Sequence, residues 1–254
     1  TEGKNKEIEV EFKDVSLMYA GSSENTIEGL NLKVLKGQTI GVIGGTGSGK
    51  TSLINMIPRF YDATNGQVLV NGTDVKKYTE EGLRNKIGIV PQKAVLFKGT
   101  IRSNLLWGNE SATENDLMEA LKQAQSYDFV MQKENGIDSV VEQNGRNFSG
   151  GQRQRLTIAR ALVRKPEILI LDDSSSALDY TTDANLRKEI AKLKDMTVFI
   201  VSQRTASIMD ADQIVVLDDG NVMGIGTHKE LLENCEVYKE IYESQFKKPE
   251  KEEM

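Results

Sequence analysis

A glycine-rich segment between an apolar run and a helix restricts the fold of this chain more than any other feature. Residues Gly44–Thr51 read G-x-x-x-x-G-K-T and directly follow the apolar run Thr39–Ile43. The apolar residues after the segment predict a helix that starts at Lys50. Strand, glycine-rich loop and helix in this order predict a phosphate cradle at the carboxyl end of a buried strand, in which backbone N–H groups point at a di- or triphosphate.

Two side chains complete the predicted cradle. Lys50 is expected to reach the β- and γ-phosphates, and the hydroxyl of Thr51 to hold Mg²⁺. A glycine-rich turn without a ligand is the alternative, but the flanking strand and helix argue against it. We therefore predict that the chain binds a nucleoside triphosphate, with contacts from Gly45, Thr46, Gly47, Ser48, Gly49, Lys50, Thr51 and Ser52.

Composition limits the other functions. The chain has 254 residues and a formal net charge of −6, which argues against a nucleic acid or an anionic membrane surface as the main partner. The single cysteine, Cys235, excludes an intrachain disulfide. Apolar runs reach about five residues, far below the ~18 that a membrane span needs. The ends, 1–7 and 247–254, are rich in Lys and Glu and are expected to be solvated tails.

Four apolar runs are expected to be parallel strands buried on both faces. Each is followed by polar residues: the cradle, Gln92, the pair Asp172 and Asp173, and the pair Ser202 and Gln203. Ligands of open α/β sheets bind at the carboxyl ends of parallel strands, so these polar groups predict one site. The four runs are Thr39–Ile43, Ile87–Val90, Ile168–Leu171 and Thr197–Val201.

The remaining segments surround this sheet. From Ile8 to about Lys36, apolar and polar residues alternate, which predicts half-exposed antiparallel strands at 10–12, 15–17 and 32–34. Between Gln92 and Pro166 the spacing is helical, which predicts an insertion of helices at 114–124, 126–131 and 149–163. Two strands, at 213–217 and 222–225, and a helix near 237–245 follow towards the end of the chain.

Two further features point to phosphate chemistry. Asp172 ends a buried strand, as metal-holding aspartates do in phosphate-loop NTPases, so it is expected to hold Mg²⁺ while Asp173 lies nearer the terminal phosphate. Ser149–Gln152 matches the capping-box spacing S-x-x-Q, which is a structural reading. Two glycines in the first turn of a helix are costly, however, and suit a backbone that a ligand approaches closely, so anion binding stays a second reading.

These motifs occur in the order seen in ATP-binding cassette (ABC) ATPases, which the chain resembles from about Ile8 to Gln245. The resemblance rests on the cradle, Gln92, Phe148–Gln152, the Asp172 strand and Ser176–Asp179. Leu96–Asn104 further resembles the multidrug-exporter branch. The resemblance to ABC ATPases implies an α/β fold with a phosphate-loop NTPase core sheet, an N-terminal antiparallel β subdomain and a helical insertion.

The resemblance also implies an organisation and a location. Residues 8–246 would form the nucleotide-binding domain, with a helical subdomain at about 93–166 and a charged tail at 247–254. Residues 1–7 would link it to a membrane domain, fused N-terminally or on another chain. The domain would then bind ATP and Mg²⁺ at the cytoplasmic face of the cell membrane, pair with a partner cassette and power export.

Residue roles follow from the same resemblance. Tyr19 would stack on adenine, although without the family a half-buried strand-end tyrosine is the simpler reading. Thr51, Gln92 and Asp172 would hold the metal. Asp179 would link the two sites of a dimer, and the signature segment Ser149, Gly150, Gly151 and Gln152 would reach the partner's ATP.

Three positions depart from the family pattern. Asp173 stands where most members have a catalytic Glu, Gln203 where they have a switch histidine, and Gln143 where exporters usually carry a Glu. The only histidine, His228, is expected to have a structural or surface role. A shorter carboxylate and a neutral amide at the catalytic positions 173 and 203 predict slow hydrolysis with binding intact, hence one unequal half of a heterodimer. Neutral drift at two tolerant positions is the alternative.

Two other functional classes were weighed. A soluble ABC ATPase of DNA repair or translation would keep the same motifs, but the acidic charge and the exporter-like stretch Leu96–Asn104 count against it. A phosphate-loop kinase would leave the Ser149 segment and the helical insertion unexplained.

Overall fold

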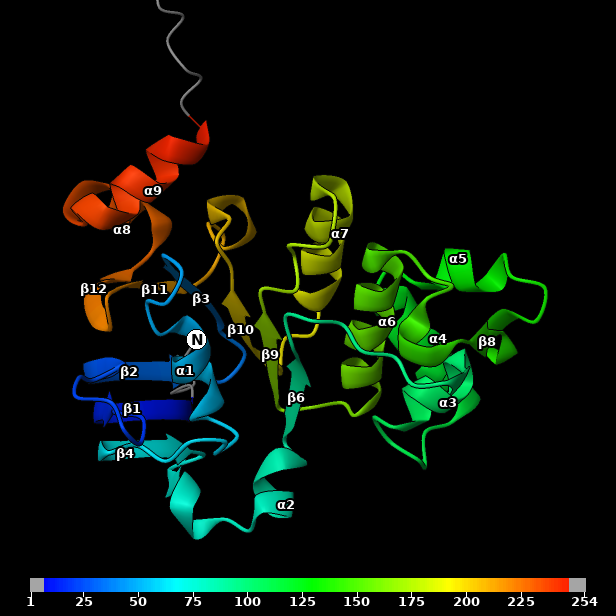
Figure 1. Cartoon of the computed structure of the whole chain (residues 1–254), viewed down its shortest axis with the longest axis horizontal. Coiled ribbons are helices and arrows are strands. Elements are labelled where there is room, and N and C mark those ends of the chain that lie inside the picture. The colour runs from blue at the N-terminus through cyan, green and yellow to red at the C-terminus, as the bar shows by residue number, and fades with distance from the viewer. Residues whose placement is uncertain (1–6, 247–254) are drawn as a thin grey trace, which may run out of the picture.

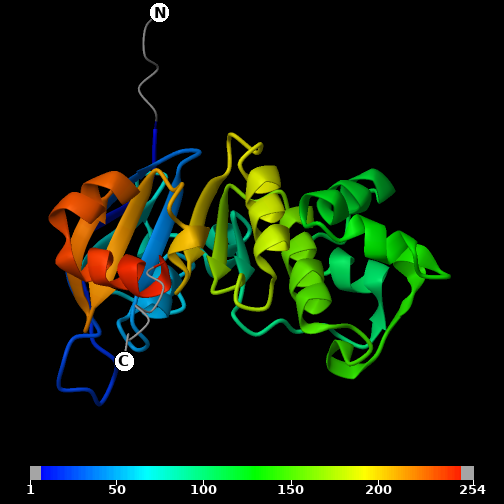
Figure 2. The same cartoon turned by 90° about the horizontal axis from the view of Figure 1, so that it is seen from above.

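The computed structural model describes residues 7–246, so the predicted tails lie outside the described residues except for Glu7. Two lobes lie side by side in Figures 1 and 2. One contains two β-sheets and the chain's last helices, and the other is mostly helical.

A six-stranded sheet forms the centre, in the order β12-β11-β3-β10-β9-β6. The strands from β11 to β6 in this order are parallel, and β12 is antiparallel to its neighbour. All five residues of β10 are buried, as their apolar run predicts for a strand covered on both faces. The strands are β3 (Thr39–Gly44), β6 (Ile87–Val90), β9 (Ile168–Asp172), β10 (Thr197–Val201), β11 (Gln213–Asp218) and β12 (Asn221–Gly226).

A second, antiparallel sheet has the order β2-β1-β4-β5, with β1 (Ile8–Leu17), β2 (Ile27–Leu35), β4 (Asn65–Val70) and β5 (Thr73–Asp74). The prediction was wrong in two respects. Segments 10–12 and 15–17 belong to one strand, whose register shifts near Asp14, a residue with φ of +48°. This strand is also buried rather than half-exposed, because β2 and β4 flank it and its side chains enter the core between the sheets.

The helical lobe contains the predicted helices. They are α4 (Glu114–Gln123), α5 (Tyr127–Met131) and α6 (Gly150–Val163), preceded by α3 (Ile101–Leu106). This lobe also contains a two-stranded antiparallel ribbon of β7 (Gly99–Thr100) and β8 (Val140–Val141), and the 3-10 turns η2 (Gly136–Asp138) and η3 (Gln143–Gly145).

The other elements lie between the strands or follow β12. They are α1 (Lys50–Asn55), η1 (Val75–Lys77), α2 (Glu80–Arg84), α7 (Tyr180–Ile190), η4 (Thr205–Ser207), α8 (His228–Asn234) and α9 (Glu236–Phe246). No helix within residues 7–246 is both long and apolar enough to cross a bilayer.

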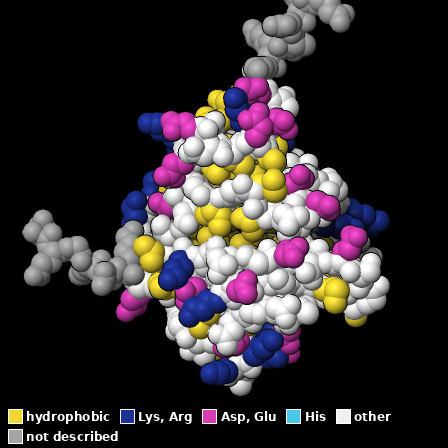
Figure 3. All heavy atoms as spheres, turned by 90° about the vertical axis from the view of Figure 1, so that its left-hand side faces the viewer, with side chains coloured by type: hydrophobic (Ala, Val, Ile, Leu, Met, Phe, Trp, Pro, Cys, Tyr) yellow, Lys and Arg dark blue, Asp and Glu magenta, His cyan; other side chains and the backbone are white. Residues whose placement is uncertain are grey.

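Two apolar cores lie on opposite faces of the parallel sheet. On β9, Ile168 and Ile170 point into the core shared with the antiparallel sheet and α1, whereas Leu169 and Leu171 point into the core shared with the helices. This alternation follows from the two-residue period of a strand. On the side where β12 ends the sheet, at the left of Figure 1, apolar side chains gather between charged ones (Figure 3).

Candidate functional site

Four predicted polar strand ends meet at one edge of the parallel sheet. The strands β3, β10, β9 and β6 are consecutive neighbours and run in the same direction, so their carboxyl ends share that edge. The glycine-rich loop follows β3, Asp172 ends β9, and Gln92 and Gln203 lie two residues beyond β6 and β10. The topology therefore confirms the arrangement that the apolar runs predict.

The loop backbone requires glycine at the start of α1. Gly49 has φ of +98°, and a Cβ there would lie 2.6 Å from both the Thr26 carbonyl oxygen and Ile27 Cδ1. Gly47 also has a positive φ, +80°, but faces open space. No side chain caps the first turn of α1, so its backbone N–H groups remain available to an anion.

Lys50 lies inside the curve of this loop. Its Nζ donates hydrogen bonds to the carbonyl oxygens of Gly44 (2.8 Å) and Gly45 (2.6 Å). Burial lowers the pKa of the Lys50 ammonium, against the opposing effect of Asp173 and Asp172. A cation that backbone carbonyl oxygens hold within a loop of uncapped N–H groups suits a phosphate chain.

Thr51 and Asp172 offer oxygen ligands next to the loop. The Thr51 hydroxyl donates to both carboxylate oxygens of Asp172, at 3.2 Å each. Burial raises the pKa of the Asp172 carboxyl group, although the hydrogen bond from Thr51 and the positive charge of Lys50 oppose this shift. A hydroxyl and a half-buried carboxylate are hard oxygen donors of the kind that Mg²⁺ prefers. No cluster of three or more His, Cys, Asp or Glu suited to a metal occurs within residues 7–246, so phosphate oxygens and water would complete such a coordination shell.

Asp173 and Gln92 contact each other across the same edge. Gln92 Nε2 donates to Asp173 Oδ2 at 3.1 Å, which leaves the amide oxygen of Gln92 as its atom with ligand chemistry for Mg²⁺. Asp173 has φ of +46°, and burial raises the pKa of its carboxyl group. Gln203 is exposed beside β10, and its carbonyl oxygen accepts a hydrogen bond from Gln245.

Tyr19 stands at the mouth of a hollow of about 300 Å³ beside the loop. Its hydroxyl is 2.7 Å from Ser52 Oγ, and its ring meets Tyr61 edge-on at 4.9 Å between centroids. It is half-buried against the core between the sheets. Both readings of Tyr19 are thus compatible with its position. The hollow is lined by Tyr19, Thr26, Gly47, Gly49, Lys50, Thr51 and Ser52.

Ser149–Gln152 and Asp179 are engaged in capping their own helices. Ser149 Oγ accepts from the Gln152 backbone N–H at 3.2 Å, and Gln152 Oε1 accepts from the Ser149 N–H at 3.0 Å. Asp179 accepts from the N–H and hydroxyl of Thr182 at the start of α7. The capping-box reading of Ser149–Gln152 is confirmed. No hydrogen bond joins these capping residues to the loop around Lys50 within residues 7–246.

A family model described as ABC transporter matches residues 27–176, more than half of the chain. The chain belongs to the ABC transporter family. Domains of this family bind ATP, normally with Mg²⁺.

Relatives cover nearly all of this cassette. It is 44% identical over 237 residues to the uncharacterized ABC transporter ATP-binding protein YfiB of Bacillus subtilis, covering 93% of this chain and 41% of the relative. It is 41% identical to the putative multidrug export ATP-binding/permease protein YgaD of the same organism, covering 94% of this chain and 40% of the relative. The chain thus spans about two fifths of the length of these curated relatives.

The fold has a close counterpart among solved structures. A bacterial Atm1-family ABC exporter with ATP bound superposes with a TM-score of 0.90 at 33% identity, covering 95% of this chain and 42% of the exporter chain. The mixed α/β cassette with an antiparallel β subdomain is therefore confirmed.

Sequence reasoning missed Arg204, which ties the loop after β10 to the loop after β9. Its guanidinium donates to the carbonyl oxygens of Ser175 and Leu178, both at 3.1 Å, and to that of Ser176 at 3.4 Å. Ser175 and Ser202 hydroxyls are 3.3 Å apart in the same place. The only available signal was the position of Arg204 next to Gln203, because contacts between two distant loops leave no local pattern.

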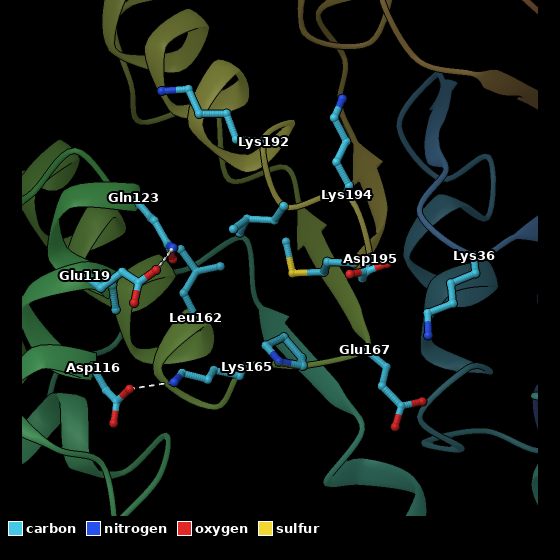
Figure 4. Close-up of a pocket in the computed structure, with 14 residues that line it drawn as sticks. Lys36, Asp116, Glu119, Gln123, Leu162, Lys165, Glu167, Lys192, Lys194 and Asp195 are labelled. Atoms are coloured by element: carbon cyan, nitrogen blue, oxygen red, sulfur yellow. Dashed lines mark hydrogen bonds and ion pairs between the residues drawn. The ribbon is translucent and has the colours of Figure 1, made fainter.

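A separate hollow of about 590 Å³ lies at the opposite edge of the sheet, where β9 and β10 begin (Figure 4). Two of the charged residues that line it, Lys165 and Asp116, form an ion pair at 2.6 Å. Lys36, Glu167 and Lys194 also line it, and no predicted site residue does.

His228 also lies away from the predicted nucleotide site, at the start of α8. Its Nδ1 is 2.7 Å from the hydroxyl of buried Tyr238, in agreement with a structural role.

Proposed function

We propose that this chain is the ATP-binding cassette of an exporter and that it pairs with a partner cassette of different sequence. Its own site binds ATP and Mg²⁺ but hydrolyses ATP slowly. The membrane domain is fused N-terminally or lies on another chain, which would hold the cassette at the cytoplasmic face of the membrane. Similarity to the putative multidrug export protein YgaD and to the Atm1-family exporter supports export over a role in DNA repair or translation.

The residues at positions 173 and 203 carry the proposal. A carboxylate that activates water must lie within roughly 2.6–3.2 Å of it, and an aspartate is one methylene shorter than a glutamate. A misplacement on the order of 1 Å can cost about 100-fold in rate. Asp173 moreover accepts a hydrogen bond from Gln92, so its carboxylate already has a partner.

Gln203 weakens the same step from the neighbouring strand. Its amide can donate a hydrogen bond to the γ-phosphate but carries no positive charge, so it stabilises developing negative charge less than a histidinium would. Bound Mg²⁺ would neutralise charge on the β- and γ-phosphate oxygens. Lys50 and the loop N–H groups would still hold the phosphates, which leaves binding intact.

The signature segment supports the heterodimer. Ser149, Gly150, Gly151 and Gln152 follow the family pattern, with Phe148 in place of the usual Leu. Such a segment would complete a competent site whose Glu and His come from the partner. ATP held in the slow site would then act as a tether while the other site turns over.

The test is to purify the chain alone and to compare its ATP turnover with that of an Asp173→Glu, Gln203→His double variant. The unmodified chain should turn over little ATP and self-associate weakly at most when ATP is added. The double variant should be faster, by up to roughly 100-fold from the carboxylate alone. Adding Lys50→Ala to the double variant is the control for contaminating ATPases, because it should abolish the gain. Rapid turnover by the unmodified chain would contradict the proposal.

A further inference from the structure

The last described helix, α9, reaches back to the loop that carries Gln203. Gln245 lies in its final turn, next to the end of the described residues. Its Nε2 donates to the carbonyl oxygen of Gln203 at 2.8 Å, and its Oε1 accepts from the backbone N–H of Thr205 at 2.9 Å. One amide therefore holds the chain on both sides of Arg204.

The position of α9 is itself fixed by packing. Tyr238 of this helix is fully buried, and its hydroxyl meets His228 Nδ1 on α8 at 2.7 Å. The His228 ring also contacts Tyr242, with centroids 5.2 Å apart. Figure 1 shows α9 above the central sheet, on the side of β11 and the loop after β10. Gln245 thus belongs to a helix that is packed against α8 through Tyr238 and Tyr242.

The loop that Gln245 holds is also anchored by contacts of its own residues Arg204 and Thr205. Arg204 donates its backbone N–H to Ser202 Oγ at 2.9 Å, and its side chain reaches the loop that contains Ser175–Leu178. Thr205 is buried, and no hydrogen-bond partner of its hydroxyl is found within the described residues. The Gln203 carbonyl oxygen and the Thr205 N–H have Gln245 as their hydrogen-bond partner within the described residues, whereas the Thr205 carbonyl oxygen accepts from the N–H groups of Ile208 and Met209.

We infer that Gln245 is a positioning residue for Gln203, so that helix α9 sets how the loop after β10 meets the terminal phosphate of bound ATP. The inference rests on the proposed role of Gln203 at the γ-phosphate. A loop fixed at its backbone presents the Gln203 side chain in fewer orientations, which lowers the entropic cost of its contact with phosphate. Because ADP lacks the γ-phosphate, the effect should be confined to ATP.

Dissociation constants of Mg·ATP and Mg·ADP, measured on the whole chain by titration calorimetry, test the inference. Gln203→Ala should lower the preference for ATP over ADP by roughly tenfold, as expected for one hydrogen bond to a charged group. Gln245→Met, which keeps the size of the side chain but removes both hydrogen bonds, should lower it by roughly threefold to tenfold. ADP affinity should stay nearly unchanged, and the melting temperature of Gln245→Met should fall by about a few degrees, because the buried Thr205 N–H loses its hydrogen-bond partner. Ser244→Ala is the matched control, because within residues 7–246 the Ser244 hydroxyl donates only to the Ile241 carbonyl oxygen of its own helix.

A double-mutant cycle separates positioning from a general structural effect. If Gln245 acts through Gln203, the Gln203→Ala, Gln245→Met pair should prefer ATP no less than Gln203→Ala alone. Gln245→Glu adds a second separation, because a carboxylate still accepts from the Thr205 N–H but cannot donate to Gln203. The Gln245→Glu variant should keep the Thr205 amide protected from hydrogen exchange but lose the preference for ATP over ADP. The Gln245→Met variant should lose the protection of the Thr205 amide as well as the preference for ATP.

The possible outcomes lead to different conclusions. An effect of Gln203→Ala with none from Gln245→Met, or additive losses in the pair, would overturn the positioning role and leave the proposed function standing. No effect of Gln203→Ala would instead refute the role of Gln203 at the γ-phosphate, and the positioning role with it.

Discussion

Two helices of this chain begin with glycine-rich turns, and the two turns differ in what satisfies their backbone. At the start of α1 no side chain caps the helix, and Gly49 adopts a left-handed conformation that its surroundings leave to glycine alone. At the start of α6, Ser149 and Gln152 satisfy each other in a capping box. Free backbone N–H groups bind an anion directly, whereas a capped turn needs nothing further in the single chain. The first turn therefore has N–H groups available to an anion in the single chain, and under the proposed function the second would bind phosphate only in an assembly with a partner.

We call the uncapped turn at the start of α1 the open turn and the turn at the start of α6 the capped turn. The largest expected effect tests the open turn. Lys50→Ala removes the cation that Gly44 and Gly45 hold inside the loop, and should weaken ATP binding by about 2–4 kcal/mol with the fold kept. Titration calorimetry with Mg·ATP measures the change. Lys194→Ala, an exposed lysine at the opposite edge of the sheet, is the control and should bind like the parent. Unchanged affinity in Lys50→Ala would rule out the nucleotide site described above.

The backbone of the open turn is tested by two glycines. An alanine at Gly49 combines a left-handed φ with 2.6 Å contacts to Thr26 and Ile27, and should cost about 2–4 kcal/mol of stability. Gly47→Ala is the matched variant, because its Cβ meets nothing within 4 Å; it should cost only about 1 kcal/mol. Equal losses in chemical denaturation would show that crowding at Gly49 does not govern this turn.

Tyr19, which lies beside the open turn, tests whether the base of a nucleotide binds there as well as its phosphates. If its ring stacks on adenine, Tyr19→Ala should weaken ATP binding by roughly 1–3 kcal/mol. Tyr19→Phe should keep most of the affinity although it loses the contact with Ser52. Affinities of both variants equal to that of the parent would favour the core reading, in which Tyr19 serves only the packing against Tyr61.

The open turn and its neighbouring strand ends were predictable from sequence, because each is a local pattern. Within eight residues, the motif Gly44–Thr51 contains both the glycines that shape the loop and the side chains that would contact phosphate and metal. Four apolar runs of similar length indicate adjacent buried strands. The parallel order β3-β10-β9-β6 then brings Asp172 to Thr51 and Gln92 to Asp173.

What depends on distant segments was not predictable. Strands β4 and β5 follow α1 in the chain but join the sheet of β1, and they bury a strand whose own pattern suggests half exposure. Arg204 and Gln245 bond to carbonyl and amide groups of remote loops, and such contacts leave no periodicity in the sequence. Packing between elements, and not local preference, decides these features.

The smallest expected effect tests the capped turn, and its sign is what matters. Gly150 lies in the first turn of α6, where a Cβ would meet only Arg153 Nη2, at 3.9 Å, and where φ is not left-handed. Nothing in the single chain therefore requires glycine at this position, and Gly150→Ala should stabilise the isolated cassette by about 0.5–1 kcal/mol, since alanine favours the helix. Its ATP affinity should not change, because the segment lies outside its own cradle.

The same substitution should slow ATP hydrolysis by the assembled transporter, where a partner's phosphate would approach the backbone of this turn. Gly151→Ala is the comparison variant, because its Cβ would lie 3.2 Å from the Ala177 carbonyl oxygen and should cancel the gain in stability. Thermal denaturation of the isolated cassettes and ATPase assays of the transporter measure the two effects. A destabilised Gly150→Ala cassette would mean that the single chain itself needs this glycine, and the contrast between the two turns would then fail. A stabilised cassette within a slowed transporter would instead show that Gly150 is kept at a cost to stability for a contact that only the partner supplies.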